Sequence, residues 1–207
     1  SLQYIPRFPE RTIGTGIGTA MTHTIDLLDP TTRPKAPSIA GITHAQRLHG
    51  RRLALYHKMH LRQMAHARDI MEKVAAGERQ LADLEDALSD MDMRHNYRVF
   101  GNICGQSCQI LTGHHTIEDR YLCPVISSQA DEGIRKVVDR LVAEHGVIHD
   151  YIVAVEGAAV AVMESPNPAA FATLRDAFET LESFVVSHFG YEETELEEAL
   201  GYYDVEM

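Results

Sequence analysis

Residues 174–193 read LRDAFETLESFVVSHFGYEE and carry the clearest helical pattern in the chain. The core-facing positions of this stretch follow one another at steps of four and three residues, and they are Leu174, Phe178, Leu181, Val185, His188 and Glu192. This spacing predicts an amphipathic α-helix with one face turned towards a core. His188 and Glu192 continue the apolar stripe, so two polar side chains are expected inside the protein, where each needs a partner.

Three earlier stretches repeat this pattern and predict three more long helices. They cover about residues 44–76, 95–126 and 132–163, and a short linking helix is expected near residues 81–91. Gly77 is a suitable stop for the first helix, and the sequence Ser-Pro-Asn-Pro at 165–168 separates the last two. Four long amphipathic helices joined mostly by short turns predict an all-α, up-down four-helix bundle.

Residues 1–42 differ from the rest of the chain, because they hold five of the eight prolines and a cluster of glycines. We therefore expect an extended N-terminal arm at residues 1–42, followed by the helical bundle at residues 43–207. The glycine run at residues 14–18 has no strand before it and no helix after it, so a nucleotide-binding loop is not favoured there.

The composition restricts the partners of the protein. Lys and Arg number 19 against 30 Asp and Glu, which gives a formal charge of −11 and disfavours nucleic acid and anionic membranes as partners. Three cysteines are an odd number, which fits a reducing compartment better than a disulfide framework. The chain has neither an unbroken run of about 18 apolar residues nor a secretory-signal pattern, so we expect a cytoplasmic protein.

Metal-binding residue types recur on the apolar stripes of the predicted helices. Three pairs are spaced four residues apart, which places both members on one helix face: His114 with Glu118, His145 with His149, and His188 with Glu192. On the first helix, His57 and His60 both lie on the stripe. A buried glutamate is costly without a partner, and a cation in the core would satisfy all of these groups together.

The donor types restrict the metal. Imidazole and carboxylate without thiolate fit iron, manganese or zinc better than copper(I). Five histidines and two glutamates are more donors than one tetrahedral zinc ion accepts. Two octahedral ions that share bridging carboxylates account for these donors, and carboxylate-rich bundle cores typically hold two iron or two manganese ions.

Three segments resemble the hemerythrin-like cation-binding proteins. Residues 114–119, HHTIED, with Leu122-Cys123-Pro124 after them, resemble the HHxxED…P signature of that family. Glu144-His145 with the later His149 resembles its third helix, and residues 188–193, HFGYEE, resemble its fourth. The resemblance covers about residues 50–200. It implies a di-iron four-helix bundle.

The resemblance also implies a ligand set. One iron would be bound by His145, His149 and His188. The other would be bound by His114 and a first-helix histidine, for which we prefer His57 over His60 because Leu61, Arg62 and Met64 follow His57 as in the family pattern. Glu118 and Glu192 would bridge the ions, together with an oxo or hydroxo group. Manganese or zinc could replace iron.

Some neighbouring residues are expected outside this ligand set. Oxygen carriers of the family bridge through an aspartate five residues after the last histidine, but Glu192 lies nearer His188 around the helix than Glu193 does, so Glu192 is preferred. His115 is expected to point away from the core. Cys104, Cys108 and Tyr121 are interpreted as core residues.

The resemblance does not choose among several functions. The iron bound by two histidines would keep an open position for dioxygen or a similar small ligand, which suits oxygen binding, storage or sensing. The alternatives are an oxidase, an oxygenase or an enzyme that removes peroxide or nitric oxide, and, beyond these, an iron-storage or regulatory module. A fold and a metal do not fix an activity.

Overall fold

The computed structural model describes residues 29–77 and 105–206, with side chains from Ile110 onwards in the second range. Within these ranges all regular structure is helical. In chain order the elements are η1 (Pro30–Thr32), α2 (His44–Gly50), α3 (Leu53–Ala75), α6 (Gly105–Ile117), the π-helical turn η3 (Glu118–Leu122), α7 (Cys123–Gln129), α8 (Glu132–Glu164) and α9 (Pro168–Tyr202).

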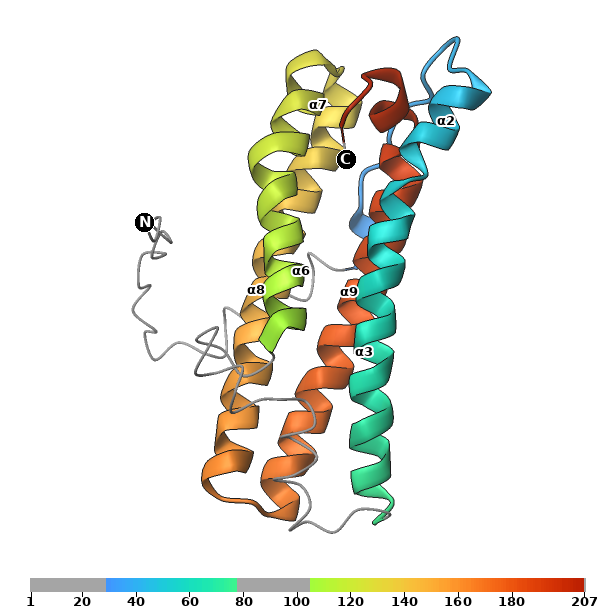
Figure 1. Cartoon of the computed structure of the whole chain (residues 1–207). Coiled ribbons are helices and arrows are strands. Elements are labelled where there is room, and N and C mark those ends of the chain that lie inside the picture. The colour runs from blue at the N-terminus through green and yellow to red at the C-terminus, as the bar shows by residue number, and fades with distance from the viewer. Residues whose placement is uncertain (1–28, 78–104, 207) are drawn as a thin grey trace, which may run out of the picture.

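Helices α3, α6, α8 and α9 lie side by side and form a helical bundle (Figure 1). The prediction of an all-α bundle is therefore confirmed. The up-down order of four complete helices, the N-terminal arm and the boundary at residue 43 stay predictions. The linking helix near residues 81–91 and the side chains of Cys104 and Cys108 lie outside what the structure describes.

Local sequence explains where the helices begin and end. Thr43 begins α2 with a reciprocal cap, because its hydroxyl accepts from Gln46 N at 3.2 Å while the Gln46 side chain accepts from Thr43 N at 2.9 Å. Gly77 follows α3 with φ +72°, a conformation that glycine adopts without strain. Asn167 caps α9 and Pro168 opens it, within the Ser-Pro-Asn-Pro segment that was predicted to separate the last two helices.

The predicted first helix is divided into α2 and α3, and α2 packs directly on the end of α9. A Cβ atom at Gly50 would overlap the backbone of Glu197, and one at Gly201 would overlap the backbone of Gln46. Only glycine allows two helix backbones to approach so closely. This contact fixes the start of α3 against the C-terminal half of α9.

Two apolar clusters lie along the bundle, and the polar residues of interest lie between them. On α9 one cluster takes buried apolar side chains from Phe171 to Phe189, and the other takes those from Tyr191 to Leu200. His188 and Glu192 lie where the two clusters meet and are fully buried. The sequence therefore places polar groups where the surrounding core excludes water.

Among the described residues, helix α8 is long and apolar enough to cross a membrane by length and composition alone. The same helix packs against α9 and buries Glu144 and His145. Such a helix in the core of a soluble protein passes the same test, so it is weak support for a membrane span.

Candidate metal centre

The second predicted helix is interrupted where it carries its glutamate. Glu118 opens the π-helical turn η3, and its carbonyl accepts a hydrogen bond from the backbone N–H of Cys123, five residues on. Pro124 favours this wide turn, because it has no N–H to donate and its ring crowds the carbonyl four residues before it. π-Helical turns of this kind often occur at functional sites.

The sequence pattern predicts a core stripe of Ile110, His114, Glu118 and Tyr121 on this helix. The structure instead buries Leu111, His115, Glu118 and Leu122. Tyr121, which was expected in the core, is 68% exposed. The observed stripe before Glu118 is therefore displaced by one residue from the predicted one.

Seven side chains from four helices converge in two groups. The first group is His115, His145 and His188, and the second is His57, His114, Glu118 and Glu192. Within each group the potential ligand atoms all lie within 4.8 Å of one another. Six of the sequence-predicted ligands are thus brought together, and their role as ligands stays a prediction.

His115 and His149 occupy positions opposite to those predicted for them. The prediction that His115 points away from the core is wrong: it is 5% exposed, and its ring stacks on that of His145 with centroids 4.3 Å apart. His149 is exposed and belongs to neither group. It lies about 40° further round α8 than His145, on the side away from Glu144 and Ile148.

The structure distinguishes the two histidines of α3. His57 Nε2 lies 3.2 Å from His114 Nε2 and 3.4 Å from Glu192 Oε2, and the His57 ring stacks on Phe189. His60 is equally buried but belongs to neither group, and its ring centroid is 5.0 Å from that of His114. This geometry favours His57 as the ligand and places His60 beside the site.

Each of the two glutamates reaches towards both groups. Glu118 Oε1 lies 3.1 Å from His114 Nε2, and its Oε2 lies 3.6 Å from His145 Nε2. Glu192 Oε2 lies 3.4 Å from His57 Nε2 and 3.8 Å from His188 Nε2. Carboxylates placed between two sets of imidazoles are suited to bridge two cations.

Three further carboxylates orient the histidines from behind. His145 Nδ1 donates to Asp119 at 2.7 Å, His188 Nδ1 donates to Glu144 at 3.0 Å, and His57 Nδ1 donates to Glu193 at 2.9 Å. Each bond leaves Nε2 as the lone-pair nitrogen that faces the cluster, the arrangement that metal-binding histidines usually have.

These orienting roles were not predicted from the sequence. A signal was present, because each carboxylate is next in sequence to a residue of the two groups: Glu118-Asp119, Glu144-His145 and Glu192-Glu193. Adjacent helix positions diverge by about 100°. The residue next to a candidate ligand can therefore contact a histidine of another helix on the side of its imidazole that faces away from the cluster. Which ring it approaches depends on the helix packing.

Several buried atoms of the two groups have no hydrogen-bond partner in the described structure. They are Nε2 of His115, His145 and His188, and both carboxylate oxygens of Glu118 and of Glu192. Buried polar atoms normally find partners, and leaving them unpaired costs free energy. Convergent imidazole and carboxylate donors without protons to share are satisfied by cations, so the residues fit a metal centre.

The pKa values of these groups show the cost of leaving them without a cation. Burial, followed by the charges of Glu192 and Asp119, raises the pKa of Glu118 well above its usual range. Burial lowers the pKa of His114 to about 3. Burial alone would raise the pKa of Glu192, but the neighbouring imidazoles of His57 and His188 lower it to about 2. The same buried surroundings thus shift the pKa values of Glu118 and Glu192 in opposite directions.

Comparison with known families agrees with this geometry. The sequence profile of the hemerythrin HHE cation binding domain matches residues 51–200. The chain belongs to the hemerythrin HHE family. No curated protein and no solved structure gave a significant match. Members of this family bind metal cations, and among the residues that the structure describes the two groups of His and Glu could hold them.

A cavity of about 770 Å³ opens beside the second group. His114 and Glu118 border it together with His60, and the remaining wall is mostly apolar. Exposed apolar side chains contribute to this wall, namely Tyr56, Met59, Ile117, Tyr121 and Val125. The first group has no residue in the wall of this cavity.

Proposed function

We propose that this HHE domain is a non-heme di-iron protein that binds dioxygen or a similar small ligand, for oxygen binding, storage or sensing. The observation that carries the proposal is the pair of adjacent donor groups with two carboxylates between them, whose inward-facing atoms are buried and unpartnered. Imidazole and carboxylate donors in such numbers suit two octahedral ions better than one tetrahedral ion.

Each residue has a defined part in this proposal. His115, His145 and His188 would hold one ion, and His57 and His114 would hold the other. Glu118 and Glu192 would lie between the ions and offset part of their mutual repulsion, which is strong at short separation in a low-dielectric core. Once bound, the iron pair would supply reversible electron transfer to the small ligand.

The ligand would enter on the side of the two-histidine group. His114 and Glu118 border the cavity, whereas His115, His145 and His188 do not. Phe189 packs flat on His57, with ring centroids 3.8 Å apart, and keeps water from that side of the group. The open coordination position is therefore expected next to His114.

The acidic composition supports further parts of this proposal. A formal charge of −11 repels phosphate backbones and anionic lipid, so we propose that the protein acts without nucleic acid or an anionic membrane as partner. The odd number of cysteines, three, fits the reducing cytoplasm, which we propose as its compartment.

The test is anaerobic loading with Fe²⁺, followed by metal analysis and exposure to oxygen. We expect about two irons per chain and a change in the optical spectrum that reverses when oxygen is removed. The same donors suit manganese and zinc, and protein made in medium containing all three metals shows which one is retained. One metal or none per chain, or no response to oxygen, would contradict the proposal.

A second candidate is an enzyme that oxidises a mostly apolar organic substrate at the same centre. The observation that favours it is the cavity, because about 770 Å³ is far more than dioxygen needs and lies in the range of pockets for small organic ligands. His60 Nδ1 is buried without a hydrogen-bond partner at this cavity and could bind a single polar group of such a substrate.

A binding probe tests this second candidate. We expect 1-naphthol, an aromatic ring with one hydroxyl group, to perturb the spectrum of the iron-loaded protein. Gly113 borders the cavity, and a Cβ atom there meets no atom within 4 Å, so we expect Gly113→Leu to narrow the cavity and weaken the effect. An equal response in wild type and Gly113→Leu would exclude this cavity as the substrate site.

A further inference from the structure

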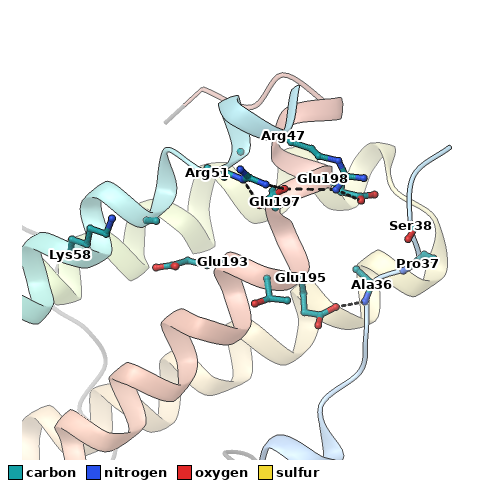
Figure 2. Close-up of a pocket in the computed structure, with 13 residues that line it drawn as sticks. Ala36, Pro37, Ser38, Arg47, Arg51, Lys58, Glu193, Glu195, Glu197 and Glu198 are labelled. Atoms are coloured by element: carbon teal, nitrogen blue, oxygen red, sulfur yellow. Dashed lines mark hydrogen bonds and ion pairs between the residues drawn. The ribbon is translucent and has the colours of Figure 1, made fainter. Parts of the chain in front are cut away.

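Residues 33–39, which we call the strap, run along helix α9 and contact it between Ser187 and Glu198. Ala36 N donates to Glu195 Oε2 and Ile39 N donates to Glu198 Oε2, both at 2.6 Å. Figure 2 shows Ala36 beside Glu195 at the edge of a charged pocket. Lower on the helix, Tyr191 donates its hydroxyl to Pro34 O at 2.7 Å. The strap is thus bound to the helix that carries His188 and Glu192.

One side chain of the strap enters the protein. The side chain of Arg33 is only 5% exposed, and its Nε and Nη2 donate to the two oxygens of Glu144, each at 2.8 Å. Its Nη1 donates to the carbonyl and the hydroxyl of Ser187 at 3.1 and 2.9 Å. The guanidinium also lies over the ring of Tyr191, 4.8 Å from its centroid. A two-pronged contact of this kind fixes both partners in orientation.

The carboxylate that Arg33 binds is itself bound to a predicted metal ligand. Glu144 is fully buried, and its Oε2 accepts from His188 Nδ1 at 3.0 Å. The carboxylates behind His145 and His57 are different, because Asp119 and Glu193 are each 36% exposed and can be solvated by water. A buried carboxylate without a cationic partner is costly, so Glu144 depends on Arg33 and on Arg140, which donates to Glu144 at 3.1 Å.

We propose that Arg33 is a positioning residue of the metal centre. It acts through Glu144, which holds His188 with its Nε2 towards the cluster. Docking of the strap and binding of metal therefore favour each other. The inference rests on the metal centre proposed above. It adds a residue from outside the matched family domain, since Arg33 precedes residue 51.

The coupling works in both directions by thermodynamic necessity. If a docked strap raises the affinity for metal, bound metal stabilises the docked strap by the same factor. Removing the partner that orients a metal-binding histidine typically lowers metal affinity by about 10- to 100-fold. Removing Arg33 acts one step further out, so we expect a loss of about tenfold.

The test compares full-length wild type with Arg33→Gln, Arg33→Lys and Lys35→Gln. Lys35 is exposed on the same strap, so Lys35→Gln removes an equal charge without touching Glu144. Fe²⁺ affinity is measured anaerobically against a competing chelator, and the spectrum of the Co²⁺-loaded protein reports on ligand geometry. Cleavage by proteinase K within residues 29–43, mapped by mass spectrometry, is compared with and without metal.

We expect Arg33→Gln to lose about tenfold in Fe²⁺ affinity, to change the Co²⁺ spectrum and to lose the metal-dependent protection of the strap. Lys35→Gln should match wild type in all three measurements. Arg33→Lys should be intermediate, because a lysine keeps the charge but not the two-pronged geometry. It also serves as the test variant if Arg33→Gln does not fold, which circular dichroism of the metal-free protein reveals.

Two failures are distinguishable. If wild type binds Fe²⁺ and neither Arg33 variant differs from Lys35→Gln, the role of Arg33 is overturned while the metal centre stands. If wild type binds neither Fe²⁺ nor Co²⁺, the proposed function is overturned and the role of Arg33 is overturned with it.

Discussion

The two halves of the candidate centre share histidine as their main donor but differ in their surroundings. In the closed half, defined by His115, His145 and His188, each residue is at most 5% exposed. In the open half, defined by His57, His114, Glu118 and Glu192, the side chain of His114 is 12% exposed and borders the cavity.

This difference in exposure explains how one cluster can retain metal and still exchange a small ligand. In the closed half, Arg33, Glu144 and His188 form a buried chain of contacts that resists reorientation. In the open half, the imidazole of His114 has protein on one side and the cavity on the other. We interpret the closed half as the part that retains metal and the open half as the part that admits the small ligand.

Glu118→Gln should have the largest effect, because it removes a charge that serves both halves. The amide keeps the shape of the side chain but no longer offsets the repulsion between two cations. We expect bound metal to fall from about two ions per chain to one or fewer, and the rise in melting temperature on adding Fe²⁺ to fall by more than half.

The control for Glu118→Gln is Glu156→Gln. Glu156 is a half-buried glutamate on α8, about 16 Å along the helix from His145, and it belongs to neither donor group. Metal content and thermal gain should equal those of wild type in this variant. Two retained ions and a full thermal gain in Glu118→Gln would show that Glu118 is not shared between the halves.

Replacing His115 and His149 tests the membership of the closed half. His115→Ala should lose about half of the bound metal, because it removes one of three imidazoles that converge there. His149→Ala should keep its metal, because His149 is exposed and outside both groups. Metal analysis of both variants, with the melting temperature of each metal-free form, separates ligand loss from unfolding. The reverse result would restore the ligand set implied by the sequence resemblance.

The pH dependence of the stability of the metal-free protein tests whether water is excluded from His60, beside the open half. Burial, with a further contribution from His57, lowers the pKa of His60 to about 4. An unfolded histidine titrates near ~6.5, so the unfolded chain takes up this proton first and the folded state loses stability as pH falls from about 6.5 to about 4. His60→Gln should lessen this loss in melting-temperature measurements, whereas His66→Gln, on the exposed face of α3, should not.

Gly113→Ala should have the smallest effect, and it tests whether the small ligand enters through the cavity. A methyl group at this helical position meets no atom within 4 Å, so the substitution should stabilise the protein by about 0.5–1 kcal/mol. Gly157→Ala on α8 has the same free space but lies away from the cavity, and should stabilise equally. A slower response to oxygen only in Gly113→Ala would support entry through the open half, and equal rates would argue against it.

The periodicity of the sequence by itself determined the all-α bundle and most of the convergent residues. Steps of four and three on residues 174–193 place His188 and Glu192 on the core stripe whatever the neighbouring helices do, because the period of an α-helix is fixed. Asn167 before Pro168 likewise specifies a helix start by local chemistry alone. Such features depend on a few adjacent residues.

The tertiary structure alone brought both of two neighbouring histidines to the centre. The helical period placed only His114 on the core stripe, whereas the packing of the helices buries His115 against His145 and leaves His114 in the other donor group. His149 fell outside because α8 packs on α9 with the face of Glu144 and Ile148 inward. Arg33 and Glu144 are 111 positions apart in the sequence. No local sequence pattern encodes their contact, because it forms only when folding brings the strap to helix α8.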